Sequence, residues 1–238
     1  MIFSSFTRVK AGIEISPNRI KTASILKKGE NYSIQNILDI EILPGTLKPS
    51  FKTKNIINSN AFKDCLKKSL KGIRVKNISV ALPDAAIKVF IKKYKEIPKE
   101  PSDIKEMVLW NTSKAFNIPV EDLRISYENM GINSENQHVF LIGLGLEEVI
   151  LQYEKYFKKI GITPTVISPA GLNQFNFYSK TLPESGNIAY LGLFDEFLNI
   201  FVFSNSMPIF YKLIKKSALG QEDGSAVNDV DMLIQYYN

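Results

Sequence analysis

A carboxylate, a polar turn and a lysine follow one another near the amino-terminal end of the chain. Residues 11–26, AGIEISPNRIKTASIL, have the pattern of a strand, a tight turn and a second strand. In such a turn, backbone N–H groups can converge on a phosphate while a nearby carboxylate holds Mg²⁺ through water. Glu14, Ser16 and Lys21 are therefore the candidate residues of a phosphate-binding loop. Pro17 weakens this loop, because proline has no N–H to donate.

Cysteine and histidine chemistry is nearly excluded by composition. The chain has one cysteine, Cys65, and one histidine, His138. A disulfide within the chain is therefore impossible, and a Cys/His zinc site lacks ligands. His138 lies in the strand-like segment QHVFLIGL, so we interpret it as an ordinary strand residue and not as the base of a Ser-His-Asp triad. We predict no catalytic residue and no metal site.

The net charge of +6, from 30 basic and 24 acidic residues, raises the question of a nucleic-acid partner. Only four of the basic residues are arginine, the side chain best suited to reading bases and phosphates. The lysines are spread along the whole chain beside many Ile and Asn residues. This distribution fits a compositional drift towards A/T-rich codons, and we predict no nucleic-acid binding.

The densest basic segment is FKDCLKKSLKGIRVK, residues 62–76, which has the pattern of an amphipathic helix. The expected apolar side is formed by Phe62, Leu66, Ser69 or Leu70, and Ile73. The expected opposite side carries Lys63, Lys67, Lys68 and Lys71. We interpret these lysines as a solvated face, and an anionic lipid or nucleic-acid surface is the alternative.

Nothing in the sequence resembles a membrane span or an export signal. The most apolar segment, residues 188–203, is interrupted by Asp195 and Glu196, whereas a transmembrane helix needs roughly 18 or more consecutive apolar residues. The first ten residues, MIFSSFTRVK, lack the apolar stretch of a signal peptide. We therefore expect a soluble protein of the cytoplasm.

The order of predicted elements indicates a repeated layout. Three strand patterns open the chain, and a polar loop, the lysine-rich helix and the apolar strand NISVALP follow, which together predict one sheet with a helix on it. From about residue 84 to 165 the order is strand, helix, strand, strand, helix, strand, a small α+β unit. Three further strand patterns then repeat the opening of the chain, at residues 187–193, 197–203 and 207–214.

Four helices are predicted after the lysine-rich one. The helix at residues 102–116 begins with Ser102 as its N-cap, and its inner stripe consists of Ile104, Met107, Val108 and Ala115. Trp110 lies on this helix, and we expect it to pack inside the α+β unit. A further helix is expected at residues 146–161, and its buried side consists of Val149, Ile150, Tyr153, Phe157 and Ile160. Another is expected at residues 168–180, with Ser168 as its N-cap and Pro169 as its first helical residue. The last is expected at residues 226–238.

This duplicated layout resembles the actin-like ATPase superfamily. Within it the chain resembles the PilM family of type IV pilus assembly proteins, and the divisome protein FtsA is a more distant relative. The resemblance spans about residues 9–215 and rests on the segments AGIEISPNRIKTASI, ISVALPDAAIKVFIKKYKEIP, the helix containing Trp110, IPVEDLRISYENMG, HVFLIGLGLEEVILQYEKYFKKIGITPTVISPAGLNQF and MPIFYKLI.

The resemblance implies an α/β fold with an α+β insert. The expected architecture is an actin-like, ribonuclease H-like duplicated fold with a small inserted subdomain and an incomplete second lobe. A first actin-like subdomain is expected at residues 1–83 and 166–186, the insert at residues 84–165, and a partial second subdomain at residues 187–238.

Compared with the family, the first phosphate loop is altered. Glu14 stands at the family's Asp position and is one methylene longer, and Ser16 replaces a glycine that lets the backbone approach a phosphate. Lys21 is kept at the spacing of the family's phosphate-facing lysine. We therefore interpret Glu14, Ser16 and Lys21 as a remnant phosphate loop.

The second phosphate loop departs further from the family. Gly192 falls on the family's Asp, Phe194 on its Gly and Leu198 on its Thr, and Asp195 fits only in a shifted register. A phenyl ring at the glycine position would block the phosphate, and the lobe that closes the nucleotide cleft has no counterpart in these residues. We expect no cofactor, and ATP with Mg²⁺ only if the protein is an active ATPase.

The resemblance implies a non-catalytic scaffold of a pilus, secretion or competence assembly, at the inner face of the cytoplasmic membrane. The expected partner is the cytoplasmic N-terminal peptide of a single-pass, PilN-like inner-membrane protein. It would bind in a groove between the first subdomain and the insert and provide peripheral membrane association. The alternative is a nucleotide-binding actin-like ATPase of the same assembly, or a sugar kinase. A ribonuclease H-like nuclease would need three or four clustered carboxylates, and only Glu14 and Asp195 are candidates.

Overall fold

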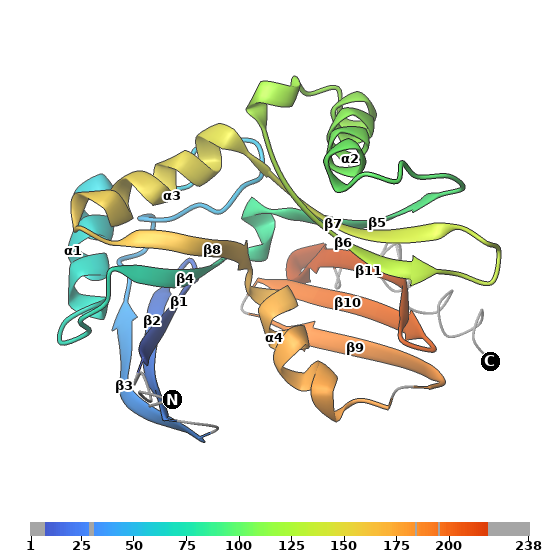
Figure 1. Ribbon diagram of the computed structural model, residues 1–238. Helices are drawn as coiled ribbons and strands as arrows, with labels where there is room; N and C mark the ends of the chain where they lie inside the picture. The colour runs from blue at the N-terminus through green and yellow to red at the C-terminus, as the bar shows by residue number, and fades with distance from the viewer. Residues whose placement is uncertain (1–7, 29–30, 184, 195, 219–238) are drawn as a thin grey trace, which may run out of the picture. The chain divides into compact units, whose positions relative to one another are not determined.

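The computed structural model describes residues 8–28, 31–183, 185–194 and 196–218 (Figure 1). They form two compact units. Unit 1 comprises the described residues of Met1–Ile87 together with Gly145–Ala170. Unit 2 comprises Lys88–Leu144 together with the described residues of Gly171–Asn238. The expected α/β fold is confirmed.

Unit 1 is built on one five-stranded sheet with the strand order β3-β2-β1-β4-β8. Its elements are β1 (Arg8–Ile15), β2 (Arg19–Lys28), β3 (Asn31–Glu41), α1 (Ser59–Ser69), β4 (Asn77–Leu82), α3 (Glu147–Lys159) and β8 (Thr163–Pro169). The first three strands are an antiparallel meander, and β4 runs parallel to both β1 and β8. The predicted sheet with a helix on it is therefore present, extended by β8.

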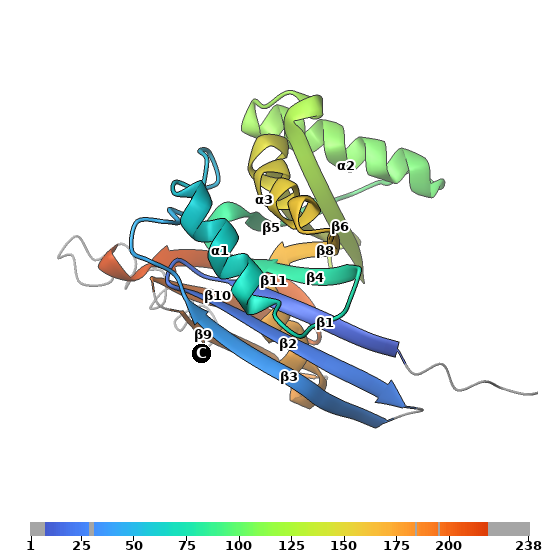
Figure 2. The same ribbon diagram turned by 90° about the vertical axis from the view of Figure 1, so that its left-hand side faces the viewer.

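One face of this sheet is covered by α1 and α3 (Figure 2). The strands alternate, so that Ile13, Ile15 and Ile20 point into the core beneath the helices while their neighbours point away. Phe62 of α1 is fully buried, and its ring stands edge-on against Tyr153 and Tyr156 of α3, with centroids 6.1 and 5.2 Å away. These aromatic contacts join α1 and α3 to each other on the same face of the sheet.

The long loop between β3 and α1 is held by α3. The side-chain oxygen of Gln152 accepts the backbone N–H groups of Asn55 and Ile56, at 2.8 and 2.9 Å. The Tyr153 hydroxyl donates to the Asn55 side-chain oxygen at 3.2 Å. Burial raises the pKa of Tyr153, so its hydroxyl stays a neutral donor. These bonds satisfy a buried asparagine and attach a polar loop to the core.

Unit 2 contains two three-stranded sheets, β5-β7-β6 and β11-β10-β9. Its elements are β5 (Lys88–Tyr94), α2 (Pro101–Phe116), β6 (Leu123–Ile132), β7 (His138–Leu146), α4 (Ala170–Tyr178), β9 (Asn187–Leu193), β10 (Phe197–Ser204) and β11 (Met207–Lys215). Val108 of α2 packs on Phe140 and Ile142 of β7. The predicted second group of three antiparallel strands is confirmed.

A second aromatic cluster joins the two sheets of unit 2. The ring of Phe175 on α4 stacks on Phe203 at 4.6 Å, with an interplanar angle of 7°, and lies 4.8 Å from Phe201. Val89 of β5 and Leu141 of β7 belong to the same buried cluster as Phe201 and Phe203. The last three strands therefore share a core with the strands of the predicted insert.

The structure places residues 145–165 differently from the predicted insert. The chain leaves the sheet of unit 1 after β4 and returns to it with α3 and β8. The buried side of α3 belongs to the core of Phe62, and β8 pairs with β4. An amphipathic pattern shows that a helix has a buried side but does not show which sheet buries it.

Several helix boundaries differ from the predictions. The helix expected at residues 62–76 runs from Ser59, where the Asn58 side chain accepts the N–H of Ala61, to Ser69. It cannot continue through Gly72, whose φ of 80° is left-handed. Its expected buried side is confirmed at Phe62, Leu66 and Ser69.

The predicted caps of two further helices were wrong. Glu100 and not Ser102 is the N-cap of α2, because Pro101 already occupies the first helical position, for which its fixed φ is suited. The strand β8 continues through Pro169, so α4 begins at Ala170.

The buried side predicted for α3 is confirmed at Val149, Ile150, Tyr153 and Phe157. The helix predicted at residues 226–238 lies outside the described residues.

The expectation that Trp110 packs inside the α+β unit was wrong. Its side chain is 55% exposed, and the ammonium group of Lys114, one turn later on α2, lies 3.6 Å from its ring centroid. Ala115, expected on the inner stripe, is exposed as well. The buried positions of α2 are Val108 and Thr112, so the inner stripe is narrower than the pattern suggested.

We expect Phe62→Ala to lower the free energy of unfolding by about 3–5 kcal/mol, because it leaves a cavity beside Tyr153 and Tyr156. The exposed aromatic variant Trp110→Ala is the control and should lose about 1 kcal/mol or less. Urea denaturation followed by circular dichroism measures both values. Equal losses in the two variants would contradict the packing described for unit 1.

Candidate functional site

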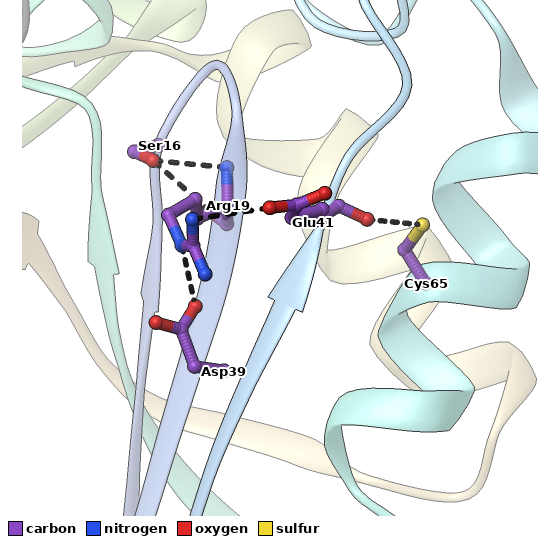
Figure 3. Close-up of polar contacts among 5 residues, drawn as sticks. All are labelled: Ser16, Arg19, Asp39, Glu41 and Cys65. Carbon is purple, nitrogen blue, oxygen red and sulfur yellow. Dashed lines mark hydrogen bonds and ion pairs between the residues drawn. The ribbon is translucent and has the colours of Figure 1, made fainter.

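The turn between β1 and β2 is closed by its own hydrogen bonds (Figure 3). The backbone N–H of Ser16 donates to the Arg19 carbonyl oxygen at 2.9 Å. The Ser16 hydroxyl donates to the same carbonyl at 3.1 Å and accepts the Arg19 N–H at 3.1 Å. Ser16 is therefore a turn residue whose polar groups bond within the chain.

Few donors remain in this turn for an anion. The N–H groups of Ser16 and Arg19 are bonded across the turn, and Pro17 has none. The Asn18 carbonyl accepts the N–H of Ile42, which attaches the turn to the end of β3. Of the backbone N–H groups of residues 16–19, only that of Asn18 has no acceptor in the described part of the chain. A phosphate-binding turn needs several converging N–H groups, so this one lacks the donors to surround a phosphate.

Glu14 and Lys21 face each other across the hairpin. They are directly opposed in the antiparallel register of β1 and β2, and Asp39 of β3 is opposed to Lys21. All three lie on the sheet face away from α1 and α3, because Ile13, Ile15 and Ile20 occupy the other face. Glu14 is partly buried and Lys21 is exposed. The structure thus brings Glu14 and Lys21 together, whereas the polar groups of Ser16 form hydrogen bonds within the turn.

Sequence reasoning missed the ion pairs that stand beside this turn. The guanidinium of Arg19 lies 2.8 Å from the Asp39 carboxylate and 3.4 Å from that of Glu41. The hydrogen bond from Arg19 lowers the pKa of Asp39 below its ordinary value of 3.8, and the charge of Lys21 acts in the same direction. The pairing register of β2 and β3 would have indicated this arrangement, since Arg19 is opposed to Glu41.

The β9–β10 hairpin contains the residues of the second altered loop. The N–H of Phe194 donates to the Phe197 carbonyl at 2.9 Å, which closes the hairpin turn. The Phe194 ring folds back over Gly192, so that a Cβ at position 192 would stand 3.1 Å from a ring carbon. Leu198 lies in β10 opposite Leu193. A phenyl ring therefore covers the backbone of the predicted Asp position, and Asp195 lies outside the described residues.

The chain's single cysteine and histidine have structural positions. Cys65 is buried on α1, and its thiol donates to the Glu41 carbonyl oxygen at 3.4 Å, which links α1 to the end of β3 (Figure 3). His138 is the first residue of β7, which confirms the strand prediction. Within the described ranges, no group of three or more His, Cys, Asp or Glu side chains is arranged to hold a metal ion.

No protein-family model matches the chain, and no curated protein matches it by sequence. Among solved structures, the chain matches one in the PilM-PilN type IV pilus biogenesis complex with a TM-score of 0.70 and 15% identity, over 87% of this chain and 61% of that chain. It also matches a Bacteroides thetaiotaomicron protein with an actin-like ATPase fold and unknown function. There the TM-score is 0.53 and the identity 11%, over 100% of this chain and 81% of that chain.

The chain has an actin-like ATPase fold. The cytoplasmic domain of EpsL, an inner-membrane component of the Vibrio cholerae type II secretion system, is a third similar structure. Its TM-score is 0.51 and its identity 12%, over 92% of this chain and 77% of that domain. This chain spans 61% of the length of its match in the PilM-PilN complex. At these identities the likeness establishes the fold, and activity and partners need separate arguments.

The actin-like fold is therefore present, and the β1–β2 and β9–β10 turns are each closed by a backbone hydrogen bond. No helix in the described part of the chain is long and apolar enough to cross a membrane. The remnant phosphate loop stays a prediction: Glu14 and Lys21 are neighbours across the hairpin, Ser16 closes the turn between their strands, and Arg19 forms ion pairs beside it.

We expect Arg19→Gln to raise the pKa of Asp39 towards 3.8, because the variant removes the hydrogen bond that lowers it. The folded-state pKa is the depressed one, so the contribution of Asp39 to stability is present above pH 3.8 and is lost as the pH falls through the folded pKa. A titration of side-chain carboxyl carbons by NMR measures the shift. Arg74→Gln, a variant of another exposed arginine in unit 1, should leave Asp39 unchanged, and an equal Asp39 pKa in Arg19→Gln and the parent chain would contradict the ion pair.

Proposed function

We propose that this protein is a non-catalytic scaffold of a pilus, secretion or competence assembly at the inner face of the cytoplasmic membrane. The observation that carries the non-catalytic part is the closed β1–β2 turn, in which Ser16 and Arg19 bond to each other and Pro17 has no donor. Support for the assembly comes from the fold, which is similar to a chain of the PilM-PilN complex and to the cytoplasmic domain of EpsL.

The alternative is a nucleotide-binding actin-like ATPase of the same assembly. The specific observation in its favour is the direct opposition of Glu14 and Lys21 beside the turn. A carboxylate and a lysine at this spacing could hold Mg²⁺ and a phosphate if other groups supplied the missing donors. The Phe194 ring over Gly192 argues against a second phosphate contact of the kind that the resemblance predicts.

We expect isothermal titration calorimetry to detect no binding of Mg-ATP at nucleotide concentrations up to about 1 mM, because the turn lacks converging donors. A dissociation constant in the low micromolar range would contradict the non-catalytic proposal. Lys21→Ala then decides where the nucleotide binds. Loss of that binding in Lys21→Ala would place the nucleotide at this loop and favour the ATPase alternative.

The proposed partner is the cytoplasmic N-terminal tail of a single-pass, PilN-like inner-membrane protein. An extended tail can add to the edge of a sheet, where backbone hydrogen bonds supply affinity and side-chain contacts supply specificity. In unit 1, β3 is an edge strand, and Tyr32, Ile34 and Ile37 on it are 57%, 65% and 66% exposed. An edge strand with exposed apolar side chains favours pairing with another chain.

Point variants are better suited than a truncation to test this proposal. Removal of residues 187–238 would take away Phe201 and Phe203, which share a buried cluster with Val89 and Leu141. The remaining chain would then expose the core of unit 2. Peripheral membrane association through the partner is part of the same proposal.

We expect the pair of variants Ile34→Lys and Ile37→Lys, combined in one chain, to weaken partner binding by about tenfold or more. The probe is a synthetic peptide with the N-terminal cytoplasmic sequence of a single-pass inner-membrane protein of the same organism whose gene adjoins that of this chain. Fluorescence anisotropy measures its binding. The matched control is Leu191→Lys with Leu193→Lys on β9, an edge strand of the other unit with 58% and 70% exposed side chains. Loss of binding in the β9 pair alone would contradict a site on unit 1.

A further inference from the structure

A basic pocket lies where the carboxyl ends of α1 and α3 meet in unit 1. Its volume is about 420 Å³, within the range of small-molecule sites. Lys67 of α1, Arg74 of the following segment and Lys159 of α3 contribute the polar groups. Leu70, Ile73 and Ile162 contribute to its apolar floor. Among the residues that the structure describes, no acidic and no aromatic side chain lines it.

The topology of the sheet brings these residues together. The helix α1 precedes β4 and α3 precedes β8, and the first residues of these parallel neighbours, Asn77 and Thr163, are directly paired. The two helices must therefore both end at the end of the sheet where β4 and β8 begin. The Thr163 N–H donates to the Lys76 carbonyl at 2.8 Å, which holds the two connecting segments side by side.

The pocket is built on rigid structure. Leu70, Ile73 and Ile162 are each only 8% exposed and belong to the core of unit 1. The helix ends are satisfied by backbone bonds, since the N–H of Leu70 donates to the Lys67 carbonyl and that of Lys71 to the Lys68 carbonyl. At the end of α3, the N–H of Ile162 donates to the Phe157 carbonyl. The lysine side chains are therefore not needed to cap the helices.

The three cationic groups are available to a ligand. Lys67, Arg74 and Lys159 are exposed, and none of them forms an ion pair with any residue that the structure describes. The ammonium of Lys159 lies 5.2 Å from the Tyr156 ring centroid. Three unpaired positive charges around an apolar floor form a site for an anion that is attached to an apolar group.

We propose that this pocket binds the phosphate headgroup of an anionic membrane phospholipid. Lys67, Arg74 and Lys159 contact the phosphate, and the apolar floor contacts the glycerol and the first acyl carbons. Each basic residue near an anionic membrane surface adds attraction, and a charge-assisted contact with a phosphate adds more than a diffuse one. This inference goes beyond the proposed scaffold role and does not depend on the partner peptide.

The lining favours a lipid over other phosphate-bearing macromolecules. Single-stranded nucleic acids bind on aromatic side chains that stack with their bases, and the lining formed by the described residues contains none. Peptide recognition needs neutral polar groups for the peptide backbone, and the side chains of the lining are cationic or apolar. An apolar floor beside a cationic rim matches the structure of a phospholipid, in which acyl chains adjoin a charged headgroup.

The test is co-sedimentation of the full chain with vesicles in the absence of any partner. One set of vesicles contains roughly one-third phosphatidylglycerol in phosphatidylcholine, and the other contains phosphatidylcholine alone. The pocket variant is Lys67→Ala/Arg74→Ala/Lys159→Ala. The control variant is Lys68→Ala/Lys71→Ala/Lys158→Ala, which removes the same number of positive charges from the same segments, outside the pocket lining.

We expect the parent chain to bind the phosphatidylglycerol vesicles preferentially. The pocket variant should bind them about tenfold more weakly than the control variant, because both lose the same diffuse attraction and only one loses the direct contacts. Equal weakening in the two variants, or no preference for phosphatidylglycerol, would overturn the proposal. Binding of an RNA oligonucleotide that tracks the pocket variant, with no vesicle binding, would overturn it in favour of nucleic acid.

A second variant keeps the charge and fills the pocket. Val75 lines the pocket and is partly exposed, so Val75→Phe should reduce vesicle binding while all three cationic groups remain. Unchanged vesicle binding in Val75→Phe would show that the headgroup does not enter and would overturn the site. Inorganic phosphate distinguishes a lipid headgroup from a free phosphate ion as the ligand. Vesicle binding that persists in millimolar phosphate supports the lipid. Binding of phosphate without binding of vesicles would overturn the lipid proposal. Thermal unfolding of each variant confirms that it is folded.

Discussion

The parallel pairing of β4 with both β1 and β8 is the constraint on which unit 1 depends. Two parallel neighbours cannot be joined by a tight turn, so the chain must cross over the sheet before it enters β4 and again before it enters β8. The first crossover contains α1, and the second contains the whole of residues 88–144 followed by α3. Both helices therefore lie on one face of the sheet, where Ile78, Val80 and Leu82 of the interior strand β4 are almost fully buried.

The same constraint decides what the β1–β2 hairpin can present. Because α1 and α3 cover one face, the acid and the lysine of the hairpin must lie on the other, where Glu14 and Lys21 are opposed. The fold therefore keeps their positions whether or not the turn between them binds a phosphate. The local chemistry of the turn belongs to Ser16, Pro17 and Arg19, which close it without a ligand. Fold and activity can separate in this way because packing maintains the first and a few polar groups decide the second.

The basic pocket is a product of the crossovers. Two helices that lead into adjacent parallel strands must end side by side, and here both ends carry lysines in their last turns. Such lysines interact favourably with the helix dipole in any case. Arg74, which follows α1 outside the helix, adds a third charge to the same place. Residues 67, 74 and 159 become one surface only through the pairing of β4 with β8.

The amino-acid sequence by itself determined the elements whose patterns are local. The alternating strands and the buried side of α3 could be predicted because periodicity acts within a few residues, and the missing donor at Pro17 follows from the chemistry of proline. The hydrogen bonds by which Ser16 and Arg19 close this turn were not predicted. The obstruction expected from a phenyl ring at position 194 stays a prediction, and the position of that ring over Gly192 was not predicted from the sequence.

Only the tertiary structure decided which sheet each element joins. Contacts between distant segments place α3 over the core of Phe62 and leave Trp110 exposed. They also pair Arg19 with Asp39 and bring Lys67 and Lys159 to one pocket. A helical pattern states that one side is apolar but not what covers it, and a strand pattern does not state its register. The free energy of burying those faces, which is summed over the whole sheet, selects the partners.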